Sequence, residues 1–215
     1  MGTLLVSALI VSYRRILLDP SPGVTWLDAD FLRMTNKAER LACLLKPEIL
    51  TARAAIPLVA GSHQTLPVGG IALFDLYENA GSKRRVSQIS RANMDAANRV
   101  WPAATPEQDV QHWTFDPRTR KQFECFPPND GSGSVVGLYG ITPTPIAAVG
   151  SAINLDDIYE AVLEAFVVSL AYAENTTRQD LAKMASYDTQ GKQLLGVSTS
   201  AQIATAQKSA NPGGT

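Results

Sequence analysis

Apolar side chains recur at helical spacing near both ends of the chain, and the strongest repeat lies in residues 155–175. There Ile158, Val162 and Ala165 are separated by four and three residues, so they share one face of a helix. The segment contains no Gly, no Pro and no basic residue, and further apolar positions widen this face around much of the helix. We therefore expect a helix that other helices cover, with another copy of the chain as a further candidate for covering it.

Two more helices are predicted upstream of Pro47. Residues 3–18 carry two apolar stripes, and Thr3 is placed to cap their helix. The sequence at 19–23 ends this helix, because it contains two prolines and a glycine. The stretch Thr25–Asp28 is typical of a capping box that opens the second helix, and Pro47 stops it. The apolar positions of the second helix that we expect to face a core are Met34, Ala38, Leu41 and Leu45.

The repeat changes from helical to strand-like in the middle of the chain. Short apolar segments are separated there by turns that contain Gly, Pro and Asp, which is typical of strands and hairpins. We expect one hairpin around Gly61–Ser62 and another across 116–120, and Ser90 can cap a short helix between them. The predicted strands are 56–60, 64–68, 71–78, 84–89, 111–115, 122–126 and 134–141.

This order of elements predicts an α+β fold. We expect a four-helix bundle of two N-terminal and two C-terminal helices, into which an antiparallel β-rich segment is inserted. The bundle would comprise residues 1–55 and 151–195, and the inserted domain residues 56–150. Residues 196–215 would form an extended C-terminal arm, because they carry almost no large apolar side chains and have no core of their own.

Charge and cysteine content limit the classes of function that the chain can have. The formal net charge is −1, so the chain lacks the excess of positive charge that tight binding of nucleic acid requires. Only 18% of the residues are charged, which favours a surface partly covered by partner chains. Cys43 and Cys125 lie among apolar positions, so we expect buried thiols and neither a disulfide nor metal ligands. The apolar start has no preceding basic residue and is too short to span a bilayer, which predicts a structural helix of a protein that is not secreted.

Residues that could perform catalysis or bind a metal are few. His63 and His112 have no Cys, Asp or Glu at the spacing of metal ligands or of a catalytic triad. The glycine-rich run 131–137 precedes a strand and is not followed by Lys and Ser or Thr, so it predicts a turn and not a phosphate-binding loop. We therefore expect no cofactor, no bound metal and no enzymatic activity.

Two other functions stay open from the residues alone. One is a binding module in which the β-rich segment presents Trp113, Phe115 and Phe123 to a carbohydrate or protein ligand, although such aromatic residues are more often buried. The other is a hydrolase whose carboxylates meet across the fold. The acids that begin the helix at 155 could also be imagined as a metal site, but a solvated face or an interface is favoured.

The N-terminal motif resembles a known family. Residues 24–32, VTWLDADFL, with Asn36 and Ala38 following, resemble the opening of the head-to-tail adaptor proteins of short-tailed bacteriophages, which read roughly W-x-D-x-E-L-L and then N-x-A. Further matches follow in the same order and spacing from about residue 4 to residue 195, and the architecture is similar to that of tail tubular protein A. These matches are Leu58–Gly61, Gln64, Leu66–Pro67, Asp116–Pro117, Pro127–Pro128, Leu155 and Tyr159.

The resemblance implies a structural role in the virion. Such adaptors form a ring, usually of twelve copies, below the capsid portal, carry the tail nozzle and tail fibres, and let double-stranded DNA pass through the lumen. No catalytic residue is carried over, and no membrane is involved. The implied location is the neck of the virion, after assembly in the host cytoplasm. The C-terminal arm would reach the portal, with Gly196, Val197, Ile203, Gln207 and Lys208 as the contact residues.

Two charged stripes suggest how neighbouring copies would meet. Arg33, Lys37 and Arg40 recur at i, i+4 and i+7, and the acids Asp156, Glu160 and Glu164 recur at i, i+4 and i+8. We hypothesise that the basic stripe of one subunit faces the acidic edge of the next and sets their register. The alternative, two separate solvated faces, stays open.

Overall fold

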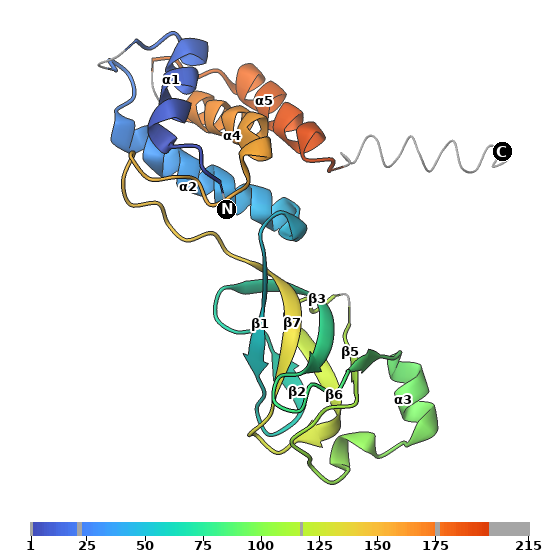
Figure 1. Ribbon diagram of the computed structural model, residues 1–215. Helices are drawn as coiled ribbons and strands as arrows, with labels where there is room; N and C mark the ends of the chain where they lie inside the picture. Colours follow the sequence, from blue (N-terminus) through green and yellow to red (C-terminus); the bar gives the residue numbers. More distant parts are fainter. Residues whose placement is uncertain (1, 21–22, 117, 175–176, 198–215) are drawn as a thin grey trace, which may run out of the picture. The chain divides into compact units, whose positions relative to one another are not determined.

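The computed structural model describes residues 2–20, 23–116, 118–174 and 177–197, and it divides the chain into two compact units (Figure 1). The first unit is formed by Met1–Ile49 and Pro143–Thr215 and is helical. The second unit, Leu50–Thr142, contains the strands. Each unit buries its own set of apolar side chains.

The helical unit is built around its most apolar helix. Its helices are α1 (Val6–Leu17), α2 (Asp28–Leu45), α4 (Glu160–Ala173) and α5 (Leu181–Leu194), with the short 3-10 helices η1 (Pro47–Ile49) and η3 (Asp157–Tyr159). Helix α4 contacts α1, α2 and α5, and eight of its fourteen residues are buried. Most of the wide apolar surface predicted for this helix is therefore covered by helices of the same chain.

The helix starts differ from those predicted. Thr3 does not cap α1; its N–H and hydroxyl donate to the carboxylate of Asp157 at 2.8 and 2.6 Å. Helix α2 begins only at Asp28, and the carboxylate of Asp30 accepts the N–H of Leu27 at 3.0 Å. The predicted capping functions of Thr3 and Thr25 were therefore wrong. The first N–H groups of α1, those of Val6 and Ser7, donate instead to the carbonyls of Ser151 and Val149 at 3.0 and 2.8 Å.

The β unit contains two sheets. The first, in the order β1-β7-β3, is antiparallel and consists of β1 (Thr51–Pro57), β7 (Ser134–Ile141) and β3 (Gly70–Asn79). The second has the order β2-β6-β5-β4, with β2 (Gly61–Thr65), β6 (Gln122–Asn129), β5 (His112–Thr114) and β4 (Ser87–Gln88). Strands β4 and β5 are parallel, and helix α3 (Arg91–Ala97) and the 3-10 helix η2 (Trp101–Ala103) lie between them in sequence.

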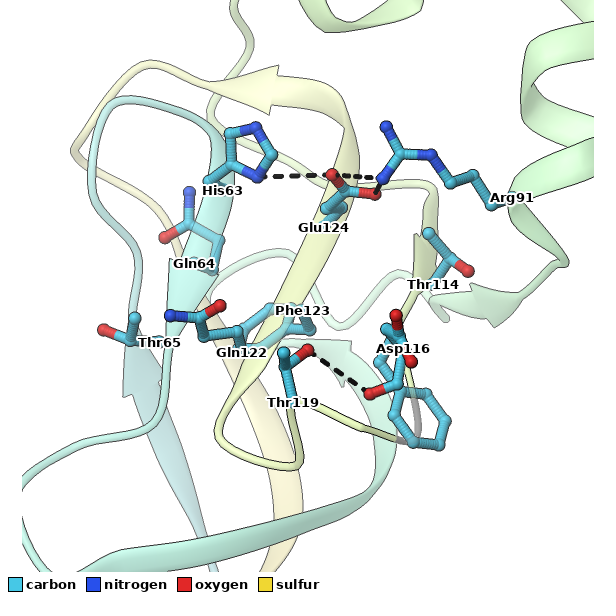
Figure 2. A pocket seen from close by; sticks show the side chains of 11 residues that line it. His63, Gln64, Thr65, Arg91, Thr114, Asp116, Thr119, Gln122, Phe123 and Glu124 are labelled. Carbon is cyan, nitrogen blue, oxygen red and sulfur yellow. Dashed lines mark hydrogen bonds and ion pairs between the residues drawn. The ribbon is translucent and has the colours of Figure 1, made fainter.

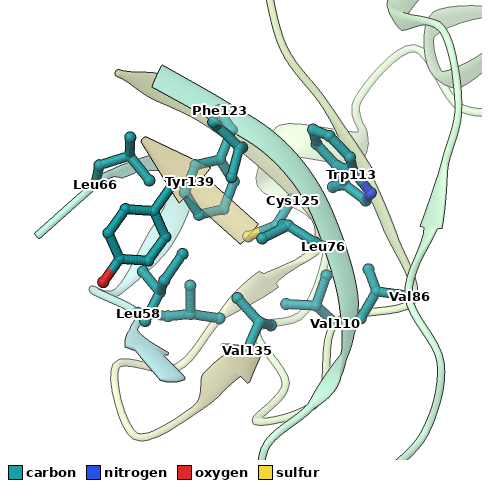
Figure 3. Close-up of a cluster of buried hydrophobic side chains, with 12 residues drawn as sticks. Leu58, Leu66, Leu76, Val86, Val110, Trp113, Phe123, Cys125, Val135 and Tyr139 are labelled. Carbon is teal, nitrogen blue, oxygen red and sulfur yellow. The ribbon is translucent and has the colours of Figure 1, made fainter. Parts of the chain in front are cut away.

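Strand pairing explains which hairpin predictions succeed. Strands β5 and β6 form the predicted antiparallel pair, with Trp113 opposite Cys125. The hairpin predicted around Gly61–Ser62 was wrong, because β1 pairs with β7 and β2 pairs with β6, in different sheets. One cluster of buried side chains joins the two sheets (Figure 3). Its largest members are Trp113, Phe123, Tyr139, Ile56 and Leu76.

The predicted architecture, a four-helix bundle carrying an inserted antiparallel segment, was wrong, although the fold is α+β. The described residues form five α-helices and seven strands in two sheets, one of which mixes parallel and antiparallel pairing. The fifth helix, α3, belongs to the β unit. The physical reason is that the β region buries a core between its own sheets, so it is a second packed unit and not an addition to a bundle. No helix in the described ranges is long and apolar enough to cross a membrane.

Candidate interaction surfaces

The predicted basic stripe lies on the exposed face of α2. Arg33, Lys37 and Arg40 are all exposed. Arg33 already pairs within its own chain, because its Nη2 donates to Glu174 Oε1 and lies 3.5 Å from Asp30 Oδ1. The hydrogen bond to Glu174 raises the pKa of Arg33. Lys37 and Arg40 form no ion pair with any residue that the structure describes, so they keep their charge available to a partner.

The predicted acidic edge is exposed only at its beginning. Asp156 and Glu160 are exposed, and the carboxylate of Asp156 accepts the N–H of Ile158 at 3.1 Å at the start of η3. Glu164 is half-buried and accepts a hydrogen bond from the hydroxyl of Ser12 in α1 at 2.7 Å. Among the described residues no ion pair joins the acidic edge to the basic stripe, so the seam remains a hypothesis about two copies.

Two polar side chains on α2 hold the segment that returns from the β region. Asn36 accepts the N–H of Ile146 at 2.7 Å and donates to its carbonyl at 3.0 Å. One turn later, the fully buried Glu39 accepts the backbone and side-chain N–H groups of Asn154 at 2.7 and 2.6 Å. Asn36 belongs to the family motif, but the motif alone does not indicate which residue this side chain binds. The sequence does carry a signal for Glu39, because an acidic residue on the apolar face of a predicted helix must find hydrogen-bond partners when it is buried.

A buried charge cluster, here named the Arg14 clamp, fixes the end of α1 to the start of α2. Arg14 donates to Asp28 at 2.7 Å and to Asp19 at 3.2 Å, and Asp19 is fully buried. The N–H groups of Val24, Thr25 and Trp26 donate to Asp19 at 3.1, 3.1 and 3.2 Å. Burial alone would raise the pKa of Asp19, but these N–H groups and the Arg14 guanidinium together lower it. The sequence at 19–23 indicated only the end of a helix, so this cluster was not predicted.

The outer side of α1 carries an apolar hollow of about 500 Å³. It is lined by Val11, Arg14, Arg15, Leu18 and Pro20. The guanidinium of Arg14 is held by the clamp, so the charge that the hollow presents at its rim comes from Arg15. The apolar residues of this hollow belong to the stripes predicted for the first helix, but the stripes did not indicate which of them would be exposed.

The β unit carries a polar cavity of about 620 Å³ (Figure 2). His63 of β2 and Thr114 of β5 lie on either side of Glu124 of β6, and Arg91 of α3 reaches over the same strand. Arg91 Nη1 donates to both carboxylate oxygens of Glu124 at 2.8 and 2.7 Å, and His63 Nδ1 lies 3.2 Å from Oε1. This carboxylate is already occupied by a cation, so it is poorly placed to act as a general base. The described residues contain no group of three or more His, Cys, Asp or Glu that could hold a metal ion.

The aromatic residues of the alternative binding module do not form a platform. Trp113 and Phe123 are buried in the core between the sheets, and Phe115 is partly buried and stacks on Trp113 with ring centroids 5.6 Å apart. Both cysteines are free and buried, which confirms the prediction for them. Burial raises the pKa of Cys43 to about 12 and that of Cys125 to about 11, so neither thiol is reactive at neutral pH.

The first two residues of the predicted portal-contact arm close the end of α5. The N–H groups of Gly196 and Val197 donate to the carbonyls of Gln193 and Lys192, both at 2.9 Å. Lys46 of α2 donates to the carbonyl of Leu195 at 3.1 Å, which ties the start of the arm to the helical unit. The other arm residues, Ile203, Gln207 and Lys208, lie outside the described residues.

The family model described as SU10 adaptor protein matches residues 5–213, and the chain therefore belongs to the SU10 adaptor protein family. No curated protein matches the chain. The family match confirms the resemblance to phage head-to-tail adaptors. Membership implies a structural adaptor that forms oligomers and contacts other components of the virion.

Proposed function

We propose that the chain forms a ring of twelve identical copies between the portal and the tail, with the tail nozzle and fibres attached below it and double-stranded DNA passing through its lumen. The observation that carries this proposal is the extent of the family match, which covers both compact units and continues to residue 213. A net charge of −1 supports the passage of DNA, because a strongly basic lumen would bind the phosphate backbone and slow its movement. The ring would be assembled in the host cytoplasm and would remain in the neck of the virion.

The C-terminal arm, residues 196–215, is proposed to attach the ring to the portal. The family match includes most of this arm, and the bond from Lys46 to Leu195 gives the arm a fixed starting point on the helical unit. Deletion of 196–215 should leave the helical unit folded and abolish attachment to the portal. Its melting transition should fall at most slightly, through the loss of the two hydrogen bonds that close α5. An arm-less chain that still co-purifies with the portal would exclude this function of the arm.

The charged seam is proposed as a contact that sets the register between copies. Lys37 and Arg40 of one copy would face Asp156 and Glu160 of the next, whereas Arg33 would first have to leave its partner Glu174. Exposed ion pairs contribute only about 0–1 kcal/mol each, so the affinity must come from apolar contacts. Ring assembly that survives reversal of the charges at Lys37 and Arg40 would exclude the seam.

Co-expression with the portal protein tests the proposal directly. A tagged full-length chain should co-purify with the portal as a particle of defined mass, and electron microscopy should show rings in the neck of purified virions. A matched control is the chain without residues 196–215. Virions in which the chain is absent from the neck would overturn the proposed function.

A further inference from the structure

Helix α1 presents apolar surface that its own chain does not cover. Val11 is 69% exposed and Leu18 is 78% exposed. The two residues are seven positions apart, so they lie on the same side of the helix, and they form the walls of the apolar hollow. Large apolar side chains grouped in a hollow, with a basic residue at the rim, are typical of a contact surface between proteins.

The backbone at Leu18 strengthens this interpretation. Leu18 ends α1 in the left-handed conformation, with φ of 52°, and its N–H is directed to the carbonyls at the end of the helix. Gly or Asn adopts this position with less strain than Leu. The side chain packs little within the described chain, so the fold by itself gives no reason for a leucine here. Strained residues that the monomer does not need are characteristic of functional surfaces.

An exposed basic residue, Arg15, lies beside Leu18 in the first hollow. A second hollow, of about 390 Å³, shares Leu18 with the first and is also lined by residues of α4 and α5 and of the segment between them. Lys183 pairs with Asp180, with Nζ 3.6 Å from Oδ2, and Arg14 is neutralised by its clamp. Arg15 is exposed and forms no ion pair with any described residue, so its charge is available to a partner. The best occupant is therefore an apolar side chain flanked by carboxylates.

The chain carries such a group at the other end of α1. Ile158 is 78% exposed within η3, between the exposed acids Asp156 and Glu160. We name these three residues the acidic tip. The turn is held firmly, because the carboxylate of Asp157 accepts the N–H groups of Thr3 and Leu4 at 2.8 and 3.0 Å. Hydrogen bonds from Thr3 lower the pKa of Asp157, so this anchor is ionised at neutral pH.

Tip and hollow cannot meet within one copy. They lie at opposite ends of α1, whose twelve residues span about 18 Å. We infer that the acidic tip of one copy inserts Ile158 into the apolar hollow of the next copy. This inference rests on the proposed ring, and it gives Asp156 and Glu160 a different partner from the charged seam. The two contacts are therefore alternatives, and the tests below decide between them. Because two different patches meet, the contact is heterologous, and its repetition closes a ring when the rotation between copies permits.

A disulfide test addresses the contact directly in the full-length chain. Leu18→Cys combined with Ile158→Cys should give a ladder of disulfide-linked multimers under mild oxidation. Each single variant should stop at dimers, since one exposed cysteine can link only two chains. The native Cys43 and Cys125 are buried and do not interfere. The matched control pairs Ile158→Cys with a cysteine at Val68, a fully exposed apolar position in the β unit. A ladder no longer than that of the control would overturn the inference.

Sedimentation of non-cross-linked variants gives a second readout. Leu18→Asn keeps a residue that accepts the left-handed conformation but removes the apolar side chain, so self-association should weaken at least about tenfold. Arg15→Glu and Glu160→Arg should each weaken association. The two changes in one chain should restore it, because each contact between copies then again joins residues of opposite charge at positions 15 and 160. Unchanged association of Leu18→Asn would contradict the inference.

The outcomes separate this contact from the proposed function. If the chain co-purifies with the portal but no ladder forms and Leu18→Asn associates normally, the contact is wrong and the adaptor ring stands. If the ladder forms but the chain joins no portal or tail component, the contact stands and the proposed function fails.

Discussion

Helices α1 and α4 both carry apolar surface wider than one stripe, yet the fold covers them differently. Helix α4 lies against three helices of its own chain, and eight of its fourteen residues are buried. Helix α1 leaves Val11 and Leu18 largely exposed. A wide apolar face therefore shows that something must cover a helix, but not whether the cover comes from the same chain. In this adaptor the case for a neighbouring copy rests on α1 and not on α4.

Truncation of the buried face should have the largest effect. Phe166 is 1% exposed in α4 and packs against α5 at Gly191. Phe166→Ala should lower the free energy of unfolding by about 3–5 kcal/mol, because it leaves a cavity at the centre of the unit. The measurement is urea denaturation followed by the circular dichroism of the helices. Val11→Ala is the control on α1 and should change stability by less than about 0.5 kcal/mol. Equal losses of stability in Phe166→Ala and Val11→Ala would contradict the view that its own chain covers α4 but leaves part of α1 uncovered.

The Arg14 clamp holds the exposed end of α1 in place, and its loss should be nearly as costly. Asp19→Asn leaves the buried Arg14 with Asp28 as its remaining acid and should lower stability at neutral pH by about 3 kcal/mol. The pKa of Asp19 is lowered in the folded chain. Its contribution is therefore complete above the unfolded value of about 4 and is lost as the pH falls through the folded value.

The measurement for the clamp is denaturation as a function of pH. The natural chain should lose stability below about pH 4 more steeply than Asp19→Asn does. Parallel pH profiles of the two chains would show that Asp19 does not act through its charge. Glu107→Gln is a suitable control, since this side chain of the β unit is exposed and forms no ion pair with any described residue.

A smaller effect tests how closely α5 covers α4. A Cβ added at Gly191 would lie 2.6 Å from Cε1 and 2.7 Å from Cδ1 of Phe166. Gly191→Ala should therefore cost about 1–3 kcal/mol through overpacking. The better helix propensity of Ala, worth about 1 kcal/mol, offsets only part of this. Gln190→Ala, at an exposed neighbour, should be neutral or slightly stabilising. A stabilised Gly191→Ala chain would mean that the two helices lie further apart than described.

Local sequence patterns predicted the positions of helices and strands better than they predicted which strands pair. The helical repeats placed α1, α2 and α4 to within a few residues, and the hairpin of β5 and β6 followed from its turn. The pairing of β1 with β7 joins Thr51 to Gly140 across most of the β unit, and no local repeat encodes such a distant pairing. For this reason the two-sheet architecture was missed.

The candidate surfaces show the same limit. The charge spacing identified exposed residues such as Lys37 and Glu160, but it could not reveal that Arg33 and Glu164 already have partners in the chain. The sequence could not indicate the importance of Leu18, because it depends on the left-handed backbone conformation at this residue. Glu39 and Asn36 act through the backbone of a segment more than a hundred residues away.

The smallest predicted effect concerns that leucine and separates stability from association. Leu18→Gly relieves a left-handed φ of 52° and removes a side chain that is 78% exposed. The relief should outweigh the greater freedom of Gly in the unfolded chain, so the free energy of unfolding should stay constant or rise by up to about 1 kcal/mol. Leu17→Gly, one residue earlier at a buried helical position, is the control and should be clearly destabilising. A marked loss of stability in Leu18→Gly would mean that the monomer itself needs this side chain. Constant or improved stability together with weaker self-association would show that the leucine is kept for the neighbouring copy.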